Sequence, residues 1–179
     1  MAITLDKSHQ EDHLGLAMRL EELDTTRLYI GGILQNASVI AAGATYTASV
    51  ADHNKTILLN TAAGSVVTLP LATGSGLHLK IITSVTCTSN NHIIIVTAGA
   101  TNMLQGTLIG TDTDTTDTQI MYPALVGDTF DTITMNGTTK GGLVGDHFFL
   151  TDVLTGTWAL FGQINQNGTV ATPFSSAVS

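Results

Sequence analysis

Beyond residue 44, short runs of β-branched and aliphatic residues are separated by Gly, Asn and Asp at close intervals. Most runs alternate apolar and polar positions, which is the period-two pattern of strands with one buried face. The predicted strands are residues 56–59, 66–69, 77–83, 93–96, 104–109, 119–122, 129–135, 147–151 and 157–162. This pattern predicts an all-β fold, a small antiparallel β-barrel or sandwich.

Three segments carry more specific signals. Residues 93–96 are Ile-Ile-Ile-Val and therefore apolar on both faces, so this strand is predicted to be central or to lie at a subunit interface. Asn136-Gly137 is the strongest hairpin signal, because both residue types tolerate the positive φ of a tight hairpin turn. A last strand pair is predicted around the turn at Gly156.

One helix is predicted, over residues 8–23. Ser8 followed three residues later by Glu11 has capping-box spacing. A seam with alternating spacings of four and three follows, comprising His9, His13, Leu16, Leu20, Leu23, Arg27 and Ile30. The residues predicted to lie at an interface, either with other copies of the chain or with a partner protein, are Leu16, Leu20, Leu23 and Ile30. The alternative is that this seam packs on the body of its own chain, because the register covers barely two heptads.

These patterns divide the chain into three parts. Residues 1–44 are predicted to form the N-terminal helix and a connecting arm, residues 45–162 the β-domain, and residues 163–179 a loosely held polar tail. At 179 residues the chain is long enough for one domain with a real core.

Charge is scarce and acidic. Charged residues make up 11% of the chain, and six Lys and Arg against fourteen Asp and Glu give a formal charge of −8. The basic residues are scattered, which argues against nucleic acid or an anionic membrane as a partner. Charges are depleted at permanent interfaces because they are costly to desolvate, so the composition favours a protein that assembles.

The termini and the cysteine content favour synthesis and folding in a cytoplasm. A single cysteine, Cys87, excludes an internal disulfide. The N-terminus lacks the basic region and apolar stretch of a signal peptide, and no apolar run reaches the roughly 18 residues of a membrane helix.

Two clusters could hold an ion, and neither has a complete ligand set. His9 and His13 lie one helical turn apart, but Gln10 stands where a zinc protease requires its Glu. The loop carboxylates are Asp112, Asp114 and Asp117, which lack the mid-loop Gly and distal Glu of a calcium loop. We expect solvated side chains at both places, and no cofactor.

No catalytic constellation is found, so we expect a protein that is not an enzyme. Ser75 lacks the spacing of a nucleophile elbow, and Cys87 is interpreted as a small strand residue. Asp52 and His53 are predicted to form a turn. The few aromatic residues lie in strand patterns, and core packing is predicted for Trp158 and Phe161, which argues against a glycan platform.

Three stretches resemble a known family. Residues 45–48 and 55–70, with an Ala-Ala-Gly turn at 62–64 and Val-Thr-Leu-Pro at 67–70, resemble the opening of small β-domains in tailed-bacteriophage virion proteins. Residues 131–146, followed by Trp158, resemble the closing half of these domains. The family is that of capsid decoration (cement) and head fibre proteins.

The resemblance implies a β-barrel or β-tulip domain that sits as a homotrimer on the capsid exterior and stabilises the lattice. The implied partner is the major capsid protein, and the family has no catalytic residues to transfer. The same small domain occurs in head fibres and tail-associated proteins, so a receptor- or glycan-binding module is the alternative. A polysaccharide depolymerase would need clustered carboxylates, whereas Asp128, Asp146 and Asp152 are predicted to mark turns and loops.

Overall fold

A computed structural model describes residues 29–30, 33–34, 38–97, 103–114 and 118–177. Strands dominate these residues, and the one 3-10 turn among them is Val50–Asp52. Two units are distinguished, Met1–Asn36 and Ala37–Ser179. Within the first, strands β1 (Tyr29–Ile30) and β2 (Ile33–Leu34) pair as a short antiparallel hairpin.

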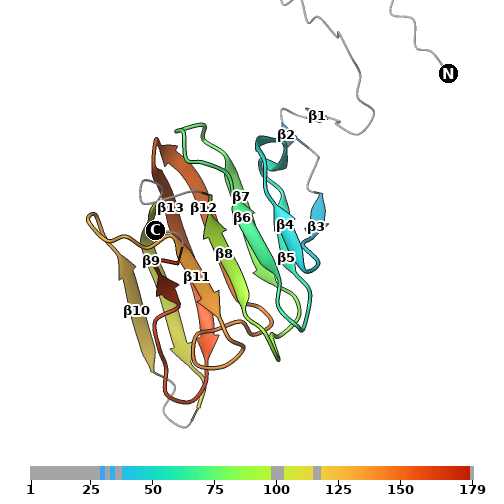
Figure 1. The fold of residues 1–179 in the computed structure, drawn as a ribbon. Helices are drawn as coiled ribbons and strands as arrows, with labels where there is room; N and C mark the ends of the chain where they lie inside the picture. The colour runs from blue at the N-terminus through green and yellow to red at the C-terminus, as the bar shows by residue number, and fades with distance from the viewer. Residues whose placement is uncertain (1–28, 31–32, 35–37, 98–102, 115–117, 178–179) are drawn as a thin grey trace, which may run out of the picture. The chain divides into compact units, whose positions relative to one another are not determined.

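The second unit contains two β-sheets, which lie face to face in Figure 1. The strands of the seven-stranded sheet are, in spatial order, β10 (Gln119–Ala124), β9 (Met103–Asp112), β13 (Thr157–Gln166), β12 (His147–Leu154), β7 (His78–Thr83), β5 (Thr56–Leu59) and β3 (Val39–Ala41). Those of the five-stranded sheet are β14 (Phe174–Ser175), β11 (Thr132–Met135), β8 (His92–Val96), β6 (Val66–Leu69) and β4 (Thr45–Thr47).

The first six strands of this unit form three stacked arches. After each of β3, β5 and β7 the chain crosses to the other sheet and forms β4, β6 and β8, respectively. Because every arch repeats the same direction, β3, β5 and β7 are parallel, and so are β4, β6 and β8. The later strands add antiparallel pairs and one long parallel pair, β13 with β9.

The core lies between the sheets and follows from the period of two. Strands β5, β6 and β7 each alternate fully buried with partly exposed residues. Trp158 is fully buried, and its indole Nε1–H donates to the carbonyl of Pro70 at 3.1 Å, so the polar group of this large side chain is satisfied. Tyr46 and Tyr122 pack against the edge of the same core.

The all-β class predicted from the alternation is confirmed, but the sheets are mixed rather than wholly antiparallel. The alternation reports which face of a strand is buried, and it is the same for both strand directions. The strands predicted at 56–59 and 66–69 are found with the same bounds. Strand β8 lies between β6 and β11, which confirms the central position predicted for residues 93–96.

The signal at Asn136-Gly137 marks a turn but not a hairpin. Strand β11 before it belongs to the five-stranded sheet, and β12 after it belongs to the seven-stranded sheet. Asn136 Oδ1 instead accepts the N–H groups of Thr138 and Lys140 at 3.1 and 3.0 Å, so its side chain closes a local loop.

Both boundaries predicted for the β-domain require correction. Residues 39–41, assigned to the arm, form strand β3 at the edge of the seven-stranded sheet, so the body begins before residue 44. The segment 163–179, assigned to a loose tail, contains the end of β13 and strand β14, in which Phe174 is buried against the core. Apolar burial of Ile164 and Phe174, together with the hydrogen bonds of the buried Gln166 amide to the carbonyls of Thr139 and Ala171, holds this segment in place.

Candidate functional site

Most of the predicted interface residues lie outside the described part of the chain. Leu16, Leu20 and Leu23 are outside it, as are His9 and His13. Ile30 lies in the short strand β1, so the helical spacing predicted from the sequence does not extend to this residue.

The acidic loop does not assemble into an ion site within the described residues. Asp112 is buried at the end of β9 and accepts the N–H of Asp114 at 3.3 Å, while Asp117 lies outside the described residues. Across the described residues, no group of three or more His, Cys, Asp or Glu side chains is placed to hold a metal ion.

The candidate nucleophiles are engaged in structural contacts. The Ser75 hydroxyl donates to Asp152 Oδ2 at 2.7 Å, and its oxygen accepts the N–H of Leu77. His53 follows the Val50–Asp52 turn, which confirms a turn at this position, and its Nδ1 accepts the N–H of His78. Cys87 is buried, but in the loop between β7 and β8 rather than in the predicted strand, with Sγ against the carbonyl of Asn90.

Asp146 is a buried clamp between the 142–146 loop and β13. Its Oδ2 accepts the N–H groups of Gly142 and Leu143 at 2.7 and 3.1 Å. Its Oδ1 accepts the backbone and side-chain N–H groups of Asn165 at 2.8 and 3.0 Å. Burial raises the pKa of Asp146, although these four donors act in the opposite direction.

Asp152 clamps the loop at residues 73–75. It was predicted to mark a turn or loop but lies inside strand β12, with its carboxylate directed at the loop. The carboxylate accepts the N–H groups of Thr73, Gly74 and Ser75 at 2.7–3.0 Å and also both hydroxyls. Burial alone would raise the pKa of Asp152, but the hydrogen bonds from Ser75 and the loop amides outweigh it and lower the pKa to about 2.

Asp152 therefore makes folding stability depend on pH in the acid range. The folded pKa of about 2 lies below the value of about 3.9 in an unfolded chain, so the stabilisation is present above about pH 4 and is lost as the pH falls through 2. We expect Asp152→Asn to lower the free energy of unfolding by up to about 2 kcal/mol at pH 7, with a smaller difference from wild type near pH 2. Urea denaturation at pH 7, 4 and 2.5 measures this, and a difference that does not change with pH would contradict it.

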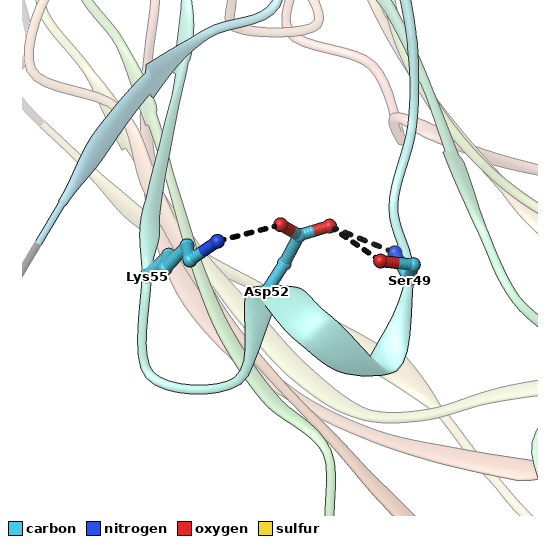
Figure 2. A network of polar contacts seen from close by, with 3 residues as sticks. All are labelled: Ser49, Asp52 and Lys55. Atoms are coloured by element: carbon cyan, nitrogen blue, oxygen red, sulfur yellow. Dashed lines mark hydrogen bonds and ion pairs between the residues drawn. The ribbon is translucent and has the colours of Figure 1, made fainter. Parts of the chain in front are cut away.

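A third buried carboxylate, Asp52, closes the 3-10 turn (Figure 2). It accepts the backbone N–H of Ser49 at 2.9 Å and the Ser49 hydroxyl at 3.2 Å, and it forms an ion pair with Lys55 at 3.2 Å. Burial raises the pKa of Asp52, but the hydrogen bonds from Ser49, Tyr46 and Lys55 outweigh this and lower it. The pattern is the same as at Asp152: the carboxylate holds a loop.

These clamps leave little charge on the surface of the β-body. The described carboxylates of residues 38–177 are all aspartates, and five of the seven are buried: Asp52, Asp112, Asp131, Asp146 and Asp152. Asp128 and Asp114 are the other two, and Asp128 accepts the N–H of Leu125 in an exposed turn. Charged side chains are therefore even scarcer on the surface of the β-body than the sequence composition indicates.

The outward residues of the seven-stranded sheet, here called the outer face, form continuous rows across all seven strands. One row is Pro123, Thr107, Phe161, Phe149, Lys80, Thr56 and Val39. The next is Met121, Ile109, Gln163, His147, Ile82, Leu58 and Ala41. Lys80 carries the single formal charge in these two rows, and neither row contains a carboxylate.

An aromatic cluster occupies the middle of the outer face. Phe149 stacks on His78 with ring centroids 6.4 Å apart, and the His147 ring stands edge-on at 5.7 Å. Lys80 Nζ lies 5.6 Å from the centroid of the Phe149 ring, within the range of a cation–π contact. Phe161, directly across the β12–β13 pair, is 52% exposed, so the core position predicted for it is wrong.

A shallow hollow lies on the other sheet. It has a volume of about 560 Å³ and is lined by Val66 and Ile93 of strands β6 and β8 and by the loops that contain Thr61, Asn90 and Asn91. Aliphatic side chains therefore lie beside hydroxyl and amide groups without a charge. Gly64 permits the close approach of the two loops, because a Cβ there would lie 2.5 Å from the carbonyl oxygen of Asn91.

Comparisons with family models, with curated proteins and with solved structures found no match. The part of the chain that the structure describes contains no helix with the length and apolar character needed to span a bilayer.

Proposed function

We propose that this chain is a virion structural protein, a capsid decoration (cement) protein that binds as a homotrimer to the head of a tailed phage and stabilises the capsid lattice. Its partner is the major capsid protein, and it has no catalytic role. It is made in the host cytoplasm and lies on the capsid exterior. Neither nucleic acid nor a membrane is a direct partner.

The observation that carries this proposal is the placement of charge. Five of the seven described carboxylates of the β-body are buried as loop clamps or core residues, and the outer face presents Phe, Ile, Met, Thr and Gln side chains. Surfaces that become permanently covered are depleted of charge, since each charge would have to be desolvated. The family resemblance of residues 45–162 adds the phage head as the place of assembly.

The buried clamps also suit a mechanical role. Asp146 and Asp152 each connect a loop to a strand that is distant from it in the sequence. Asp152 of β12, for example, accepts the N–H of Thr73, and Asp146 accepts that of Asn165 in β13. A body whose loops are held in this way loses little additional conformational freedom on binding, so more of the contact energy remains for holding neighbouring capsid subunits together.

We expect the full chain to bind saturably to expanded capsids that lack it, as a particle of about three times the 18.7 kDa chain mass. Cosedimentation measures the bound copies, and the temperature at which the capsids release their genome measures the stabilisation. Expanded capsids with the protein should release their genome at a higher temperature than capsids without it, because each bound trimer adds buried interface to the lattice. Absence of binding to capsids at chain concentrations well above micromolar would contradict the proposal.

The hollow between the loops at Gly64 and Asn91 favours a second candidate function, a receptor- or glycan-binding module of a head fibre or tail. Its hydroxyl and amide groups beside aliphatic side chains are the groups that an uncharged sugar can contact. A glycan array with the full chain, repeated with Asn90→Ala, tests it: binding that is lost in the variant supports this candidate, and an array without binding contradicts it.

A further inference from the structure

The outer face of the seven-stranded sheet stands out because it is wide, apolar and almost uncharged. Met121 and Phe161 are more than half exposed on it, and Val39 extends the apolar character to the edge strand β3. Nine of the fourteen residues in its two rows are apolar, and an exposed surface so rich in apolar side chains marks an interaction site.

The chemistry of the face selects against charged partners. Lys80 is the one formal charge in its two central rows, and its ammonium group lies over the Phe149 ring rather than apart from the apolar surface. One cation is too few to bind a polyanion, and a basic partner would find no carboxylate to pair with. A second copy of the same face, in contrast, brings no carboxylate, and the one charge that it brings, the Lys80 ammonium group, already lies over the Phe149 ring.

The size of the face fits a subunit interface. At about 4.8 Å between strands and about 3.3 Å per residue, the seven strands cover roughly 740 Å² of flat sheet. A stable interface buries about 800 Å² on each partner. The face as a whole therefore offers each copy about the area that a stable interface buries, and in a trimer this area is divided between two neighbours.

We infer that copies of this chain associate through the outer face, with the Phe149 and Phe161 cluster at the centre of the interface. Aromatic residues and Met are enriched at the centres of such interfaces, and charges are depleted there. The inference rests on the homotrimer of the proposed function and specifies which surface forms it. It locates self-association on the sheet rather than on the leucines at positions 16, 20 and 23.

The test is the mass of the full chain in solution, measured by light scattering over a concentration series. We expect wild type at about three times 18.7 kDa and Phe161→Glu at the single-chain mass, or associating at least tenfold more weakly, because three carboxylates would be buried together. Phe161 is half exposed in one copy, so circular dichroism and thermal unfolding of the monomeric variant should remain those of a folded β-protein.

The matched control is Val126→Glu, which places the same charge on another exposed apolar residue, in the turn after β10. This variant should keep the wild-type mass. A monomeric wild type, with or without glycan binding, overturns the inference, and so does a Phe161→Glu variant with unchanged association. A trimeric wild type that does not bind capsids would contradict the proposed function alone. A Phe161→Glu variant that is still trimeric and still binds capsids would contradict the outer-face interface alone.

Discussion

Replacing Asp146 with alanine is expected to lower the free energy of unfolding by about 3–5 kcal/mol. The substitution leaves four N–H donors without their acceptor, those of Gly142 and Leu143 on one side and two from Asn165 on the other. Asp146 is fully buried, so water cannot replace the lost carboxylate without opening the loop. Urea denaturation of the full chain at neutral pH measures the loss.

Asp128→Ala is the control for this prediction. Asp128 also closes a turn, but it accepts a single backbone N–H, that of Leu125, in an exposed position. Its removal should cost about 1 kcal/mol or less. Asp146→Asn should fall between the two, because the amide retains one acceptor oxygen. Equal losses at Asp146 and Asp128 would show that the buried clamp contributes no more than an ordinary surface turn.

Gly106→Ala is expected to prevent folding, or to destabilise the chain so far that little soluble protein is obtained. Gly106 lies in β9 with φ +147°, between Ala124 of β10 and Leu160 of β13. A Cβ at this position would collide with the backbone carbonyl oxygen of Leu160, which cannot move without breaking the parallel β9–β13 pair. The measurements are soluble yield and, where protein is obtained, the midpoint of thermal unfolding.

Gly127→Ala separates backbone strain from this collision. Gly127 also has a positive φ, +99°, but a Cβ there meets nothing within 4 Å. Its substitution should cost about 1 kcal/mol, the usual penalty of a side chain in this region of φ. A Gly106→Ala variant as stable as Gly127→Ala would show that β9 and β13 can separate at this position without loss of stability, and would contradict the prediction.

The strands themselves could be predicted from the sequence because their signal is local. The runs at 56–59 and 66–69 alternate over four residues, and this suffices to place one face inside. The same alternation argues against the core position that we predicted for Phe161. It lies three residues after Trp158, and positions separated by an odd number point to opposite faces of a strand, so both could not enter the core.

The role of the aspartates could be predicted only in part. Asp is frequent in turns, and this correctly placed Asp52 and Asp128. Asp152 instead lies in a strand and reaches a loop 79 residues earlier in the chain, to Thr73. Nothing near Asp152 in the sequence indicates that partner. The outer face was missed for the same reason, because Phe149, Lys80 and Thr107 become neighbours only across paired strands.

The sequence by itself determined that the protein is all-β, where most strands lie, and that charge is scarce, since each of these depends on composition or on the local period of two. The tertiary structure alone decided which sheet each strand joins, that the arches stack in parallel, and that five of the seven described carboxylates are buried while a face with Lys80 as its one formal charge remains outside. The physical reason is that alternation along a strand specifies a buried side but not the neighbouring strand or its direction. Strand partners are selected by packing and hydrogen bonding between segments far apart in the chain.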